Sequence, residues 1–168
     1  SGFVTSYEPE SGEVLWNLTG MGGSFTSSPA TDANRIYFGN SGPGSRGPLV
    51  AVNAGASGDI DLRAGDDEQD GLAWSVRSAG PGMASPVVVN GYLYVVSSGI
   101  LGCYDAETGD RVYRERLPEM SSAASSLIGT GDHVYILGEQ GKTAVVKVGQ
   151  DYELVAENLV EGLFWSTP

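Results

Sequence analysis

The sequence predicts an all-β protein built from repeated four-stranded antiparallel units, and three observations lead to this fold class. The chain is rich in turn residues, with 25 glycines and 8 prolines among 168 residues. Its apolar segments are short, rich in Val, Tyr and Ile, and bounded by turn residues, as is typical of strands. A motif containing serine also recurs at a spacing near 40 residues. Four short strands at such a period are typical of a β-propeller blade.

The recurring motif is a small residue followed by Ser, Pro and an apolar residue. It is found at Ser28 and Ser85, in weaker form at Ser125, and begins again at Ser166, so that the spacings are 57, 40 and 41 residues. The first spacing includes an acidic insert of about 16 residues, and without it all three are close to 41. We interpret these segments as inner strands, which crowd toward the propeller axis and therefore tolerate only small side chains.

A second repeated motif has the same spacing as the serine motif. Residues 6–16 align without a gap on residues 103–113, and this offset of 97 residues equals the distance between Ser28 and Ser125. We therefore predict one propeller segment over residues 1–168. Its parts are a partial blade at 1–18, a blade at 24–77 with an acidic insert at 55–71, blades at 82–117 and 120–160, and the start of a further blade at 162–168.

Four strands are expected in each complete unit. The most regular unit has predicted strands at 83–89, 92–97, 100–104 and 111–116, with a two-residue type I′ turn at Asn90-Gly91, because both central residues of that turn need positive φ. The preceding unit has predicted strands at 25–31, 35–39, 49–53 and 72–76, with a long hairpin loop at 41–48. The following unit has predicted strands at 123–128, 133–138, 143–148 and 152–157, and a new first strand is expected at 163–168.

Large aromatic residues recur on the outer strands. These are Trp16, Trp74, Tyr113 and Tyr152. A rigid ring at a recurring outer position fills the space between the faces of neighbouring sheets at a low entropic cost. We therefore expect these rings to pack between blades, with ligand stacking as the alternative.

One stretch carries a more specific pattern. Asp105, Thr108 and Gly109 are followed four positions later by Tyr113, and an earlier copy retains Gly12 and Trp16. Each glycine is expected to supply the positive φ of a hairpin turn, while the neighbouring Asp and Thr accept hydrogen bonds from backbone donors of the turn. The pattern thus indicates blade construction and says little about activity.

This pattern resembles the pyrroloquinoline-quinone-like (PQQ-like) repeat, with Asp105, Thr108 and Gly109 at the positions of its tryptophan-docking motif and Tyr113 in place of the usual Trp. Such repeats build the propellers of quinoprotein alcohol dehydrogenases and, without a cofactor, the propeller lipoprotein of the outer-membrane β-barrel assembly machinery. The resemblance covers essentially the whole chain. It implies a larger propeller of about eight blades and a periplasmic or extracellular location.

The resemblance to the dehydrogenases implies a quinone on the ring axis, a calcium ion held by Glu, Asn and Asp oxygens, a catalytic Asp and two adjacent cysteines. A chain whose only cysteine is Cys103 cannot build that pair, and no residue set matches the site by position. We therefore expect no enzyme activity, no catalytic residue and no cofactor. A fragment of a PQQ- and calcium-dependent dehydrogenase is the alternative, and a sensor or sugar-binding propeller is a third possibility by fold analogy.

Three other features were weighed as sites. Cys103 lies in an apolar strand, where a small buried hydrophobe is expected. His133 is the only histidine and flanks a turn, and no nucleophile motif accompanies it, so a surface role is expected. The insert holds a dense set of carboxylates without the pattern of a calcium loop, so a solvated loop is expected and no metal site is assigned. These carboxylates are Asp59, Asp61, Asp66, Asp67, Glu68 and Asp70.

Charge limits the possible partners. The chain has 21 Asp and Glu against 9 Lys and Arg, a formal net charge of −12. Its field repels phosphate backbones and anionic headgroups, so nucleic acid is excluded as a partner, and no apolar run is long enough for membrane insertion. We expect a non-catalytic scaffold that binds a protein partner through loops on one face, with the segments at 42–48 and 55–71 as candidates.

The two ends predict incomplete blades. The chain begins within a third strand and ends in a new first strand, and about 3.7 repeats do not close into a ring. We therefore expect a piece of a longer propeller whose open blade faces drive self-association, for example into an eight-bladed pair of chains.

Overall fold

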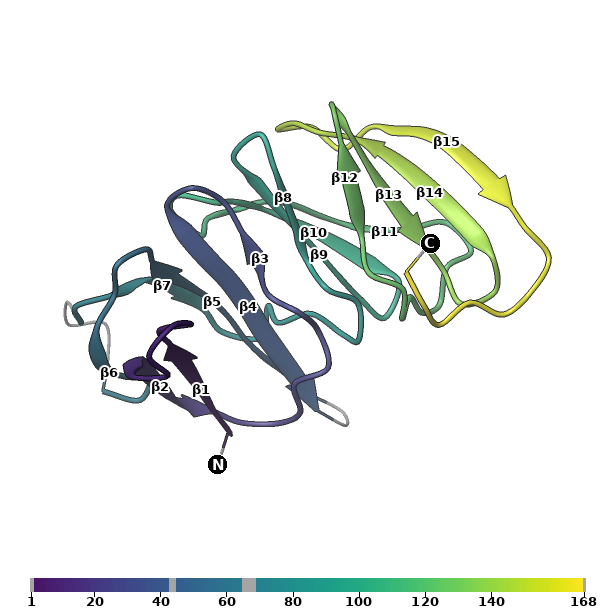
Figure 1. The fold of residues 1–168 in the computed structure, drawn as a ribbon. Coiled ribbons are helices and arrows are strands. Elements are labelled where there is room, and N and C mark those ends of the chain that lie inside the picture. Colours follow the sequence, from purple (N-terminus) through teal and green to yellow (C-terminus); the bar gives the residue numbers. More distant parts are fainter. Residues whose placement is uncertain (1, 43–44, 65–68, 168) are drawn as a thin grey trace.

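The computed structural model describes residues 2–42, 45–64 and 69–167, which form 15 strands and no helix. The strands make four sheets, and Figure 1 shows these sheets following one another from the N-terminal to the C-terminal end with their faces packed together. This confirms the predicted all-β propeller segment. Within the described part of the chain, no helix is long and apolar enough to span a membrane.

Each sheet is taken as one blade. Blade 1 has three strands in the order β1-β2-β6, and the other blades have four antiparallel strands each. Blade 1 consists of β1 (Gly2–Tyr7), β2 (Val14–Met21) and β6 (Gly58–Asp61). Blade 2 consists of β3 (Ala30–Thr31), β4 (Arg35–Gly42), β5 (Ser45–Asn53) and β7 (Leu72–Val76). Blade 3 consists of β8 (Val87–Val89), β9 (Tyr92–Ser97), β10 (Ile100–Asp105) and β11 (Arg111–Arg116), and blade 4 of β12 (Ile128–Thr130), β13 (His133–Leu137), β14 (Lys142–Lys147) and β15 (Leu154–Leu159).

The apolar core lies in three layers between consecutive blades. Because side chains alternate between the two faces of a strand, neighbouring residues enter different layers. Phe38 packs toward blade 1, whereas Tyr37 packs toward blade 3. In the same way Leu93 packs toward blade 2 and Tyr94 toward blade 4. Both faces of the middle blades are therefore buried, which explains why β9 is almost continuously apolar.

The turn at Asn90-Gly91 has the predicted conformation. The φ angles are 49° at Asn90 and 81° at Gly91, and the strands pair on either side of these two residues. This confirms the type I′ hairpin.

The predicted inner strands are shorter than expected. The first strands of blades 2, 3 and 4 begin only at Ala30, Val87 and Ile128, after the serine motif. Pro29 and Pro86 lack the N–H that a ladder needs. The backbone before them bonds instead to serine hydroxyls of the next blade, so the motif links blades and lies outside the strands.

The hairpin of blade 2 is longer than predicted. β4 and β5 continue through most of the segment expected as a loop, and the pairing runs to Gly42 opposite Ser45. Pro43 and Gly44 lie outside the described residues. The prediction of a long loop was wrong. The glycines and prolines in this segment interrupt the apolar sequence pattern, but the backbone pairing between β4 and β5 continues through it.

The acidic insert contains a strand. β6 pairs in parallel with β2 and forms the edge strand of blade 1, with Trp16 opposite Gly58 and Leu18 opposite Ile60. Ile60 is completely buried. The expectation of a purely solvated loop was wrong for this part, because one apolar residue of the insert enters the core between blades 1 and 2.

The C-terminal blade also differs in detail. Its last strand is Leu154–Leu159, two residues later than predicted, so Tyr152 lies just before it. No strand forms within 163–167, although a new first strand was expected there, and Pro168 lies outside the described residues. This segment has no neighbouring strand to complete a ladder.

Candidate functional site

The two segments selected from the sequence as binding loops converge on one cavity. The first residues of β5 contribute Arg46, Gly47 and Pro48, and the segment after β6 contributes Leu62 and Arg63. The cavity has a volume of about 470 Å³. Departures from the plain blade plan that are 14 residues or more apart in sequence thus form one surface feature.

The start of β5 is held in place by bonds to later parts of the chain. The Arg46 guanidinium donates a hydrogen bond of 3.0 Å to the main-chain oxygen of Ser97 in blade 3. The Gly80 N–H donates one of 2.9 Å to the main-chain oxygen of Gly47. Gly47 cannot be replaced easily, because a Cβ there would overlap the buried side chain of Asn40.

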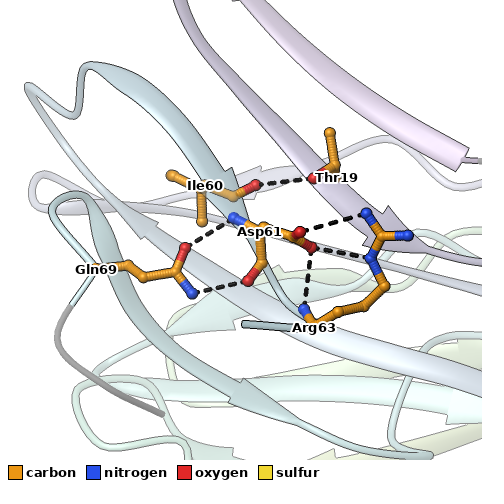
Figure 2. A network of polar contacts seen from close by, with 5 residues as sticks. All are labelled: Thr19, Ile60, Asp61, Arg63 and Gln69. Carbon is orange, nitrogen blue, oxygen red and sulfur yellow. Dashed lines mark hydrogen bonds and ion pairs between the residues drawn. The ribbon is translucent and has the colours of Figure 1, made fainter. Parts of the chain in front are cut away.

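The insert is folded back by a polar network around Asp61, shown in Figure 2. Arg63 donates to the Asp61 carboxylate through Nε at 3.0 Å and through its backbone N–H at 3.1 Å. The Gln69 amide exchanges two hydrogen bonds of 2.7 Å with the backbone of Asp61. The bonds from Arg63 hold the pKa of the Asp61 carboxyl below its usual value. The network ties Asp61, Arg63 and Gln69 of the insert together next to the cavity.

Two carboxylates of the insert have structural partners. Asp59 accepts a hydrogen bond of 3.2 Å from the Asn17 amide, and Asp61 is engaged by Arg63. Asp66, Asp67 and Glu68 lie outside the described residues. Among residues 2–42, 45–64 and 69–167, no three His, Cys, Asp or Glu side chains are grouped so that they could hold a metal ion.

A second cavity lies along the turns of three blades. It has a volume of about 510 Å³ and is lined mainly by small polar residues. Arg46 lies on its edge as well, and Glu139 supplies a carboxylate. The serines are Ser41, Ser97, Ser98, Ser121 and Ser122. Hydroxyl and main-chain groups of this kind can form hydrogen bonds with an incoming polypeptide.

The predicted blade residues lie away from these cavities, in the joints between blades. Trp74 packs against Gly109 of blade 3, where a Cβ would meet the ring at 2.6 Å. Trp16 stacks on Phe38 of blade 2 with ring centres 6.2 Å apart. Tyr113 meets Tyr152 edge-on at 5.7 Å.

The turn residues form a local hydrogen-bond motif. Asp105 accepts hydrogen bonds from the backbone N–H groups of Glu107 at 2.8 Å and Thr108 at 2.9 Å. The Thr108 hydroxyl donates to the Asp110 carboxylate at 2.9 Å. Gly109 has φ +77°, and Gly12 in the earlier copy has φ +73°. Both glycines thus adopt the left-handed conformation that the turn requires.

Two further residues singled out from the sequence have no catalytic surroundings. The Nδ1 of His133 lies 2.7 Å from the Asp132 carboxylate on the surface, and no described serine or cysteine hydrogen-bonds to this pair. Cys103 is completely buried, and burial raises the pKa of its thiol to about 11. A buried thiol of high pKa is a poor nucleophile.

Sequence reasoning missed the arginines of this face. Arg46, Arg77, Arg111 and Arg114 come from two strands and a loop, and together they line a cavity of about 350 Å³ between blades 2 and 3. The available signal was weak: Arg111 and Arg114 lie on one strand of a chain with only nine basic residues. Only the packing of two blades brings the four together.

Comparisons with known proteins identify a family and several structures that are similar to this chain. The sequence profile of the family described as outer membrane protein assembly factor BamB matches residues 1–151. No curated protein sequence matches the chain. The crystal structure of BamB from Moraxella catarrhalis is similar, with a TM-score of 0.68 and 18% identity, over 95% of this chain and 43% of that one.

Two quinoprotein structures share the fold. A europium-containing methanol dehydrogenase has a TM-score of 0.54 and 10% identity, over 83% of this chain and 26% of its own. The quinohemoprotein alcohol dehydrogenase ADHIIG from Pseudomonas putida HK5 has a TM-score of 0.57 and 14% identity, over 82% of this chain and 21% of its own. This chain spans less than half the length of each of the three structures.

Proposed function

This chain belongs to the family of the outer membrane protein assembly factor BamB, and we propose that it is a non-catalytic propeller segment that holds a protein partner. Propellers bind partners through loops presented by a rigid scaffold. The family membership supports a role outside the cytoplasm, as part of a longer propeller.

One observation carries the proposal: the two additions to the plain blade plan meet at the same cavity. The β4–β5 hairpin and the β6 insert both reach the surface beside Arg46, Leu62 and Arg63. The polar cavity beside Ser97 and Ser121 extends the same surface across blades 3 and 4.

The dehydrogenase alternative is not supported by the residues present. In the described part of the chain no group of acidic side chains is placed to hold calcium, and Cys103 is enclosed between blades 3 and 4. The residues therefore do not fit a quinone and calcium site. Titration with the quinone and calcium, followed by absorbance, checks this point: we expect no saturable one-to-one binding, and such binding would overturn the proposal.

Site-specific photo-crosslinking tests the scaffold role. A photoreactive amino acid is placed at Leu62 or Pro48, which line the cavity, and at Val155 as a control on the exposed side of β15. In extracts of the source cells, the cavity positions are expected to give one discrete crosslinked partner that is absent at Val155. Equal crosslinking at all three positions would contradict a defined binding face.

A further inference from the structure

The basic residues of this acidic chain are concentrated in one place. Two adjoining cavities between blades share Arg46, Arg77 and Ser78, and five of the nine Lys and Arg residues line one or both of them. These five are Arg46, Arg63, Arg77, Arg111 and Arg114. The smaller cavity, which we call the arginine cleft, is lined by all of them except Arg63.

No described carboxylate neutralises the arginine cleft. The chain has 21 Asp and Glu residues, yet none is among the described residues that line either cavity. Arg63 pairs with Asp61 at 3.0 Å. The four guanidinium groups of the cleft have no ion pair with a described carboxylate, in a molecule whose net charge is −12. Placing several unpaired guanidinium groups close together costs free energy, because their positive charges repel one another. An anion bound from outside would reduce this repulsion.

The cleft has one fixed arginine and one apolar wall. Arg46 is half-buried and its guanidinium is held by the Ser97 carbonyl at 3.0 Å. Burial lowers the pKa of Arg46, and the positive charge of Arg114 adds to that effect. Tyr104 and Ala79 are almost fully buried and form the wall. Arg77, Arg111 and Arg114 are exposed at the mouth, free to turn toward a ligand.

The chemistry of guanidinium groups selects the ligand. Arginine binds carboxylate and phosphate oxygens through pairs of parallel hydrogen bonds. A long polyanion such as nucleic acid would meet the repulsive field of the rest of the molecule. A cavity of about 350 Å³ instead suits one or two side chains of a short segment. The ligand that suits the cleft is therefore a single small anionic group, the size of a carboxylate, on a short segment.

We propose that the arginine cleft, lined by Arg46, Arg77, Arg111 and Arg114, binds carboxylate side chains of an acidic peptide segment of a protein partner. The inference rests on the proposed scaffold function and names the kind of partner segment that this face accepts. The half-buried Arg46 orients the first carboxylate, and the three exposed arginines close around it.

Calorimetric titration of the purified chain at low salt tests the inference. The probes are a capped hexapeptide of alternating Asp and Glu, the same peptide with Asn and Gln, and inorganic phosphate. We expect saturable binding of the acidic peptide alone, weakening as salt is raised. Binding of phosphate without the acidic peptide, or equal binding of the neutral peptide, would overturn the proposal.

Two variants with the same charge change provide the matched comparison. Arg114→Gln removes a guanidinium that lines the cleft, and Arg116→Gln removes one from the same strand that does not. Both side chains are exposed, so the fold is expected to be unaffected. We expect Arg114→Gln to weaken peptide binding about tenfold and Arg116→Gln to change it less than about twofold.

If both variants weakened peptide binding equally, the effect would come from the overall charge of the chain. That result would contradict peptide binding in the arginine cleft. The crosslinking experiment at Leu62 distinguishes this failure from that of the scaffold role. If the crosslinked partner persists in a chain that binds no acidic peptide, the proposed function stands and the inference about the cleft falls.

Discussion

The indole nitrogen of Trp74 donates a hydrogen bond of 3.1 Å to the main-chain oxygen of Ala106, in the turn of the next blade. The Tyr37 hydroxyl donates to the same oxygen at 3.2 Å. The indole ring also lies directly on Gly109 of that turn. The aromatic end of blade 2 and the Asp-x-x-Thr-Gly turn of blade 3 thus form one joint.

Gly109→Ala is expected to destabilise the protein more than Gly12→Ala. Both glycines have φ near +75°, so an alanine costs about 1 kcal/mol or more at either position. At Gly109 the new Cβ also meets the Trp74 ring at 2.6 Å, whereas nothing lies within 4 Å at Gly12. Overpacking adds about 1–3 kcal/mol. Urea unfolding followed by tryptophan fluorescence measures both, and equal losses would show that the Trp74 contact does not constrain this turn.

Tyr37→Phe is expected to cost about 1–3 kcal/mol at neutral pH, because the completely buried hydroxyl shares its one proton between Asp32 at 2.6 Å and Ala106 at 3.2 Å. Desolvation opposes ionisation of Asp32, but the bonds from Tyr37 and two backbone N–H groups hold its pKa below the ordinary 3.8. A carboxyl with a lowered pKa stabilises the fold above that ordinary value, and the contribution is lost as the pH falls through the folded pKa.

The difference between wild type and Tyr37→Phe should therefore narrow below about pH 4. At high pH the dependence runs in the opposite direction. Desolvation, together with Asp32, raises the pKa of Tyr37 to about 12. The contribution of Tyr37 to stability is therefore complete below pH 10 and is lost as the pH rises above it. Unfolding curves at pH 7 and at about pH 3 measure the first effect. A constant difference at both pH values would argue against the Asp32 bond.

Ser85→Ala is expected to cost about 1 kcal/mol, because the Ser85 hydroxyl accepts a hydrogen bond of 2.8 Å from the Ser28 N–H. The Ser85 N–H in turn donates to the Ser126 hydroxyl at 3.3 Å, so serines link three blades in succession. Ser27→Ala, beside the link, should change stability by less than about 0.5 kcal/mol. Hydrogen exchange at Ser28 provides a local measure, and an unchanged rate in Ser85→Ala would refute the link.

The repeat was readable from the sequence because local signals and fold agree in blade 3. Asn90-Gly91, the alternation through β9 and the Asp105 turn each specify their structure within a few residues. The serine motif was also found, but its role was misread. Small residues next to proline predict crowding, whereas the bond from Ser28 to Ser85 depends on a residue 57 positions away.

The candidate site was only half readable. The departures from the repeat at 42–48 and 55–71 were visible as irregular sequence, and they do converge on one cavity. The parallel pairing of β6 with β2 could not be predicted from the sequence, because β6 has four residues and only one of them, Ile60, is buried, which is too short for a strand pattern. The arginine cleft was also hidden, since Arg46 and Arg114 become neighbours only when blades 2 and 3 pack together.

Cys103 is expected to resist thiol reagents in the native state. Its side chain is completely buried between blades 3 and 4 beside Tyr94 and Tyr113, and burial raises its pKa from 9.0 to about 11. Little thiolate forms near pH 8, and the reagent reaches it only when the layer opens. We expect labelling at least about a thousandfold slower than in concentrated urea. Asp151→Cys in a Cys103→Ala background is the exposed control and should react at once; equally fast labelling of native Cys103 would mean that these two blades do not pack face to face.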